Sequence, residues 1–232
     1  MDKQTFIETP KLYHYTTFES AEKILASNSL KFSKLSNMND INESYRPVID
    51  SLGMEISLEW IGQISLTQDG NRKGYAIPSL WGHYAQKGNG VCLVFDKEKL
   101  LGQVDDAFEY YDYIRYDDAY DNTIFTNGEY SGDYISKHRA ELFFTKKADW
   151  AYEQEYRIMG EGRDFLNFGD SLMAVILCFT DDIEKGKPIF NSVNAQSIKH
   201  IMPKDATILQ FSYAFGNPKL TNENGNIWSI NN

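Results

Sequence analysis

The segment 150–157, Trp-Ala-Tyr-Glu-Gln-Glu-Tyr-Arg, carries two carboxylates and a guanidinium at alternate positions. On a strand, side chains alternate between faces, so Glu153, Glu155 and Arg157 would share one face. Such a row could stabilise positive charge that develops on a substrate. It could equally be the solvated face of an edge strand, because surface ion pairs are common and weak. The residues alone leave both interpretations open.

A second candidate is Leu-Tyr-His-Tyr-Thr at residues 12–16. On a strand, His14 and Thr16 would share one face, and Tyr13 and Tyr15 the other. From the residues alone we favour a core strand in which the histidine is hydrogen-bonded.

The third candidate is Trp81-Gly82-His83-Tyr84. If this segment is helical, Leu80 and Tyr84 are neighbours at the i and i+4 positions. Aromatic packing explains the cluster better than a binding site does.

Several strands and helices must position these residues. Apolar runs, and strand signals bounded by turns, predict the following strands: 12–16, 30–33, 61–67, 91–95, 109–116, 150–159, 171–179, 207–215 and 226–230. A capping box with Thr16 at the N-cap and Glu19 at N3 predicts a helix that runs to about Ser27, with Asn28 as its left-handed stop. Further helices are predicted at 78–85, 97–101, 131–145 and 191–200, with a polar loop at 117–132.

The predicted strands and helices alternate irregularly, unlike the βαβ spacing of a doubly wound sheet. The chain also has no Gly-x-Gly-x-x-Gly or Walker A loop. We therefore expect an α+β fold in a single domain, residues 1–232, because 232 residues with 42% hydrophobic content suit one core. Cys92 and Cys178 lie in apolar runs and are expected to be buried strand residues rather than a disulfide framework. No Cys-x-x-Cys or His-x-x-x-His spacing suggests a metal site.

The net charge and the hydropathy of the chain limit which classes of partner we expect. A net charge of −10 disfavours nucleic acid as a partner, although a local basic patch stays open at Lys137-His138-Arg139 with Lys146-Lys147. A solvated helix face explains that patch equally well. The N-terminus lacks a signal peptide pattern, and no apolar run reaches the roughly 20 residues that span a bilayer. The expected location is the cytoplasm.

Six segments in order resemble the bacterial family DUF 2971. They are Leu-Tyr-His-Tyr-Thr (12–16), Leu-Lys-Phe-Ser (30–33), Asn39-Asp40-x-x-Glu43, Trp-Gly-His-Tyr-Ala (81–85), Gly-Val-Cys-Leu-Val-Phe-Asp (90–96) and Trp-x-Tyr-Glu-x-Glu-Tyr-Arg (150–157). The motif-bearing part covers about residues 11–180, and residues 181–232 are expected to complete the domain with strands and a helix.

That family is similar to the ADP-ribosyltransferases, and this resemblance implies a split, bent mixed or antiparallel β-sheet with flanking helices and NAD as substrate. By the resemblance, Glu155 matches the catalytic glutamate and His14 the histidine that holds NAD. Tyr15, Thr16, Ser33 and Tyr84 join the expected cofactor site. The supporting residues are Asn39, Asp40, Trp81, His83, Glu153 and Arg157. Asn39-Asp40 and the Trp81 segment have no clear role in better-known transferases, which leaves a remodelled or an inactive site as an alternative.

The implied reaction breaks the nicotinamide–ribose bond through an oxocarbenium-like state, which a carboxylate stabilises, with no metal required. The expected enzyme is an ADP-ribosyltransferase or NAD glycohydrolase, with an acceptor that the sequence does not identify. The alternative is a non-catalytic nucleotide-binding or interaction module in bacterial stress or phage defence. A nuclease or RNA-modifying factor is a weaker third interpretation.

Overall fold

The computed structural model describes residues 1–40, 48–49, 55–56, 58–118, 137–178, 189–214 and 217–228. Within this part of the chain, contacts group the residues into two compact units. Unit 1 comprises Met1–Leu30, Leu66–Gln103 and Asn167–Asn232, and unit 2 comprises Lys31–Ser65 and Val104–Leu166. The prediction of a single domain is not tested by this grouping.

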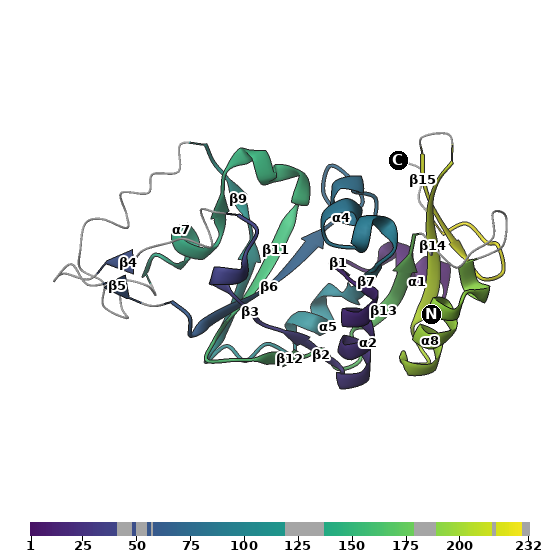
Figure 1. The fold of residues 1–232 in the computed structure, drawn as a ribbon, viewed down its shortest axis with the longest axis horizontal. Coiled ribbons are helices and arrows are strands. Elements are labelled where there is room, and N and C mark those ends of the chain that lie inside the picture. The colour runs from purple at the N-terminus through teal and green to yellow at the C-terminus, as the bar shows by residue number, and fades with distance from the viewer. Residues whose placement is uncertain are drawn as a thin grey trace. The chain divides into compact units, whose positions relative to one another are not determined.

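Unit 1 is built on a mixed sheet whose hydrogen-bonded order is β15-β14-β13-β7-β1-β6 (Figure 1). β13 and β14 pair in parallel, and β7 pairs antiparallel with both β1 and β13. Its strands are β1 (Lys11–Thr16), β7 (Val91–Asp96), β13 (Leu172–Leu177), β14 (Thr207–Ala214) and β15 (Asn217–Asn222). Its helices are α1 (Lys3–Glu8), α2 (Phe18–Ser27), α4 (Pro78–His83), η2 (Gln86–Gly88), α5 (Lys97–Leu101), η5 (Ile189–Asn191) and α8 (Val193–Ile201).

Unit 2 is centred on β6 (Ile61–Gln68), which pairs antiparallel with β3 (Ser33–Lys34) and is followed in the sheet by β11 and β8. β6 gives residues 61–65 to unit 2 and residues 66–68 to unit 1. The other elements of unit 2 are η1 (Leu35–Asn37), β4 (Val48–Ile49), β5 (Glu55–Ile56), β8 (Glu109–Tyr113), β9 (Arg115–Tyr116), α7 (Arg139–Phe143), β10 (Thr145–Lys146), η4 (Ala148–Glu153) and β11 (Glu155–Glu161). β2 (Ser29–Lys31) and β12 (Phe165–Asn167) form a separate two-stranded sheet.

The predicted fold class, α+β with a mixed sheet and flanking helices, is confirmed at this level. β7 and β13 are continuous apolar runs in which Cys92 and the residues around it are fully buried, which is typical of strands covered on both faces. Cys178, directly after β13, is also buried, and both cysteines are free thiols. The predicted helix after β1 ends as expected at Ser27, with Asn28 left-handed at φ 51°.

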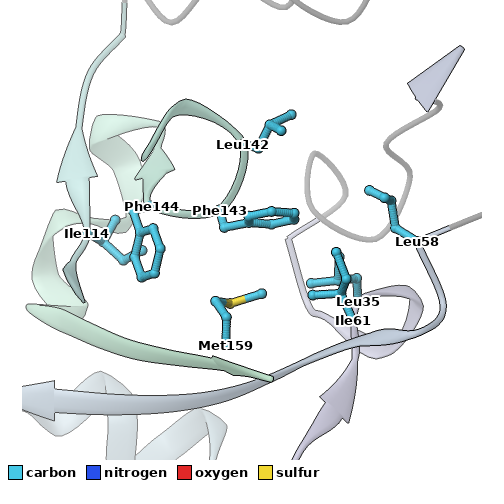
Figure 2. Packing of buried hydrophobic residues seen from close by; sticks show 8 residues of the cluster. All are labelled: Leu35, Leu58, Ile61, Ile114, Leu142, Phe143, Phe144 and Met159. Carbon is cyan, nitrogen blue, oxygen red and sulfur yellow. The ribbon is translucent and has the colours of Figure 1, made fainter. Parts of the chain in front are cut away.

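An apolar core in unit 2 is formed by residues of β6, β11 and α7 and of the segments next to them. Its buried members are Leu35, Leu58, Ile61, Ile114, Leu142, Phe143, Phe144 and Met159. Figure 2 shows Met159 between Phe144 on one side and Leu35 and Ile61 on the other. Burial of this kind is the main favourable contribution to folding.

The predicted strand at 150–159 is wrong in its first half. Residues 148–153 form the 3₁₀ helix η4, whose first amide, that of Ala148, donates to the carboxylate of Asp118 at 3.1 Å. Gln154 then takes a left-handed conformation, with φ 48° and ψ 44°, and the strand begins only at Glu155. The alternation that placed Glu153 and Glu155 on one strand face therefore does not apply to Glu153.

The predicted capping box is displaced by one residue. Thr16 remains in β1 opposite Val91, and Thr17 is the N-cap, accepting the amide N–H of Ser20 at 3.1 Å. Glu19 pairs instead with Lys23, one turn along the helix.

Four further predicted elements differ from the structure in length or continuity. The helix expected at 131–145 is the short α7, because Thr145 and Lys146 pair as β10 with β9; residues 131–136 lie outside the described part. The strands expected at 30–33 and 109–116 are each split, at Phe32 and Ile114. The final strand of the described residues is β15, which pairs with β14; of the strand predicted at 226–230, Ile227 makes an isolated bridge to Thr221, and residues 229–230 lie outside the described residues.

Candidate functional site

Unit 2 contains a cluster of four charged side chains, which we call the buried quartet: Lys146, Glu153, Glu155 and Arg157. Arg157 binds Glu155 through two nitrogens, Nε to Oε1 at 2.9 Å and Nη2 to Oε2 at 3.0 Å. The ammonium of Lys146 lies 2.7 Å from Oε2 of Glu155 and 3.0 Å from Oε2 of Glu153. Two cations and two anions therefore balance within one cluster.

The quartet is not a solvated strand face. Its side chains are between 1% and 6% exposed. Nη1 of Arg157 is also engaged, because it donates to the carbonyl of Phe143 at 2.6 Å. The interpretation of 150–157 as an exposed edge is thus wrong, and the charges lie in a medium where ion pairs interact strongly and desolvation is costly.

Local structure brings the four residues together. β10 supplies Lys146, the end of η4 supplies Glu153, and alternate positions at the start of β11 supply Glu155 and Arg157. The left-handed turn at Gln154 separates the two glutamates along the chain. Tyr116 on β9 fixes the strand start, because its hydroxyl accepts the backbone N–H of Glu155 at 2.9 Å.

The environment keeps Glu155 ionised. Burial by itself raises the pKa of Glu155, but the charges of Arg157 and Lys146, with a hydrogen bond from Ser65, lower it more. The resulting pKa lies below the ordinary value for a glutamate. Burial chiefly raises the pKa of Tyr116, so its hydroxyl stays protonated.

Residues of β6 and β3 extend the site from Glu155 to Ser65, Gln63 and Ser33. The amide nitrogen Nε2 of Gln63 donates to Oγ of Ser65 at 3.0 Å, and Ser65 in turn bonds Glu155. Ser33, a predicted site residue, lies directly opposite Gln63 in the β3–β6 pairing, so the two side chains share a face. The structure therefore brings Ser33 beside the row that leads to Glu155.

Asn39 and Asp40 lie in unit 2, beyond η1. Asn39 is exposed, whereas the carboxylate-bearing Asp40 is only 5% exposed. Glu43, the third residue of that motif, lies outside the described residues.

The predicted β1 residues lie in unit 1, with the expected alternation. Tyr13 and Tyr15 are buried on one face, and His14 and Thr16 are half-buried on the other. Tyr15 donates its hydroxyl to the carbonyl of Gly74 at 2.6 Å, and its ring meets that of Trp81 edge to face at 5.1 Å. Tyr15 thus packs in the core of unit 1.

The Trp81 segment is also largely packing. Trp81 stacks on Phe211 with centroids 5.4 Å apart, and its indole N–H donates to the carbonyl of Tyr75 at 2.9 Å. His83 is exposed, and its ring lies 6.2 Å from that of the half-buried Tyr84. This agrees with the aromatic-packing interpretation for Trp81.

The predicted residues therefore fall into two groups. Unit 2 brings together Glu153, Glu155 and Arg157, with Ser33 nearby, and also holds Asn39 and Asp40. Unit 1 holds His14, Tyr15, Thr16, Trp81, His83 and Tyr84.

Sequence reasoning missed Lys146, Ser65 and Gln63. Lys146 had been grouped with a basic patch, but it is buried in β10, so a solvated helix face is wrong for it. The signal that could have found it is electrostatic. Two glutamates and one arginine in a buried segment need a second cation.

Among the described residues, no cluster of three or more His, Cys, Asp or Glu side chains could hold a metal ion. No helix in that part of the chain is long and apolar enough to cross a membrane.

Residues 80–158 match the family described as "Protein of unknown function (DUF2971)". The match supports the family resemblance and includes Trp81, His83, Tyr84 and the whole quartet, but it leaves out His14, Ser33, Asn39 and Asp40. No curated protein and no solved structure matches the chain.

Proposed function

We propose that the chain, a relative of DUF2971 proteins, is an ADP-ribosyltransferase-like enzyme that cleaves the nicotinamide–ribose bond of NAD and transfers ADP-ribose to an acceptor. The observation that carries the proposal is the environment of Glu155, a carboxylate kept anionic inside unit 2 by Arg157 and Lys146. An anionic carboxylate is the group that an oxocarbenium-like state needs beside the ribose.

The proposed reaction exchanges one bond of the ribose carbon for another, with nicotinamide as the leaving group and the acceptor as the nucleophile. The bond between the ribose carbon and the pyridinium nitrogen breaks, and its electron pair leaves with neutral nicotinamide. The acceptor then bonds to that carbon and releases a proton. Water as acceptor would make the protein an NAD glycohydrolase.

In the proposed reaction the members of the quartet have different roles. Glu155 is the stabilising carboxylate, and Arg157 orients it through two parallel hydrogen bonds. Lys146 contacts Glu155 at 2.7 Å, and the side chain of Glu155 is only 3% exposed. A ribose hydroxyl that binds Glu155 would therefore replace Lys146 at this contact. Glu153 would then hold the displaced ammonium of Lys146.

A second candidate is a non-catalytic nucleotide-binding or interaction module. The observation that favours it is the internal neutrality of the quartet, because each charge already has a partner of opposite sign. Buried networks of this kind also occur as purely structural features.

Nicotinamide release separates the two candidates. Purified protein would be incubated with NAD, alone and with cell lysate as a source of acceptors, and nicotinamide measured by chromatography. Release in lysate supports a transferase, and release without lysate supports a glycohydrolase. Binding of NAD without release, by protein shown to be folded, would support the module.

A further inference from the structure

We propose that the side-chain carbonyl of Gln63 is a specificity-determining acceptor that receives the carboxamide N–H of the nicotinamide group. This inference rests on the proposed function, because NAD supplies the carboxamide. It concerns a residue of β6 outside the buried quartet.

Gln63 is an unusual buried amide. Its side chain is 1% exposed. Its Nε2 end faces Oγ of Ser65 and the sulfur of Met38, whereas Oε1 is buried with no hydrogen-bond partner among the residues that the structure describes. An unpaired buried carbonyl is destabilising, and native proteins rarely leave one without a water or ligand.

The position of Gln63 links it to the reacting carboxylate. Ser65, two residues along the same face of β6, accepts from Gln63 and bonds Glu155. In the proposed complex the ribose contacts Glu155 and the leaving group lies along this row, beside Gln63. The carboxamide is the hydrogen-bond donor of that leaving group.

The orientation of the amide predicts the selectivity. With Oε1 unpaired, the site accepts a neutral N–H donor and repels a carboxylate. Nicotinamide would therefore be preferred over nicotinic acid. The reverse preference would overturn the proposal, because it would mean that the free end of Gln63 is its NH₂ group.

The kinetic test compares NAD with its nicotinic acid analogue. We expect wild type to prefer NAD by roughly tenfold or more in kcat/KM, which is typical of one buried hydrogen bond. Gln63→Met keeps the side-chain length, removes the acceptor and should bring the ratio close to one. Arg157→Lys is the matched control: it weakens the two hydrogen bonds that orient Glu155 and leaves the Gln63–Ser65 hydrogen bond in place, so it should slow both substrates while it preserves their ratio. A Gln63→Met variant that keeps the wild-type ratio would overturn the proposal.

Binding provides a readout that does not need turnover. Free nicotinamide and nicotinic acid would be compared by saturation-transfer NMR on wild type and Gln63→Met. If wild type cleaves no NAD but binds nicotinamide preferentially, and Gln63→Met loses that preference, the Gln63 assignment holds while the proposed function fails. If wild type cleaves NAD and the analogue equally, the Gln63 assignment fails and the function stands. If wild type neither cleaves NAD nor binds nicotinamide, both the Gln63 assignment and the proposed function fail.

Discussion

At the scale of single residues, the buried quartet is a cluster of four charges held close together out of solvent. Arg157 and Lys146 compensate Glu155 and Glu153 at distances of 2.7 to 3.0 Å, with almost no solvent to screen them. Removing one partner from such a cluster leaves an uncompensated buried charge, which costs far more than the intact pair contributes. Substitutions here should therefore behave unlike those at surface ion pairs.

Replacing Lys146 with Met tests this difference. We expect Lys146→Met to lower the free energy of unfolding by about 3–5 kcal/mol, because Glu153 and Glu155 are then left with Arg157 alone. The matched control is Lys34→Met in the same unit, where Lys34 and Glu59 pair at 3.1 Å but are 58% and 63% exposed. That change should cost less than about 1 kcal/mol. Equal losses by urea denaturation would contradict the burial of the quartet.

The pKa of Glu155 also predicts a dependence of stability on pH. Because its pKa is lower in the folded state, its contribution is present above the ordinary value of 4.5 and is lost as the pH falls through the folded value. Wild type should therefore lose stability as the pH is lowered below about 4.5, and Glu155→Gln should lose less. Urea denaturation of both proteins over a pH series measures this. Identical pH profiles would show that Glu155 does not titrate as proposed.

At the scale of elements, the sequence predicted strands with strong local patterns and failed where tertiary contacts decide. β7 and β13 are continuous apolar runs, and the helices predicted to begin at 78 and 97 do so, with Pro78 in the first turn of α4 and Asp96 as the N-cap of α5. The range 150–154 reads as a strand by alternation, but its conformation depends on the distant Asp118 and Lys146, which no local pattern reveals. The same holds for the site. Glu155 and Arg157 were predictable from spacing, whereas Lys146, Ser65 and Gln63 come from other strands.

Two glycines test the packing of these elements. A Cβ at Gly160 on β11 would lie 2.9 Å from the ring of Phe32, whereas a Cβ at Gly82 in α4 would meet nothing within 4 Å. Gly160→Ala should destabilise the protein by about 1–3 kcal/mol through overpacking. Gly82→Ala should stabilise it by about 0.5–1 kcal/mol, since alanine favours a helix. Thermal unfolding of both variants would decide, and a harmless Gly160→Ala would contradict the described β11–Phe32 contact.

At the scale of the whole molecule, charge governs which partners are expected. The net charge is −10, and Lys146, one cation of the only basic patch that the sequence suggested, is buried in the quartet. We therefore expect no mobility shift with DNA or RNA at about 150 mM salt, because binding that rests on phosphate contacts needs accessible cations. A salt-sensitive shift would contradict this.

The division into two units could not be predicted from the sequence. Each unit is assembled from separate stretches of chain, and β6 contributes to both. No linker or change of composition marks these boundaries. The chain order of the motifs therefore did not indicate that the expected NAD residues of β1 and the expected catalytic residue of β11 belong to different units.

The most direct test of the central claim is nicotinamide release by Glu155→Gln beside Met159→Ala, each normalised to its folded fraction. Met159 lies on the same strand, is fully buried in the apolar core and should cost about 2–5 kcal/mol when truncated, so it controls for lost stability. We predict that Met159→Ala retains wild-type release per folded molecule, whereas Glu155→Gln loses roughly 100-fold or more. Full release by folded Glu155→Gln would contradict a catalytic Glu155 and leave the quartet a structural feature of unit 2.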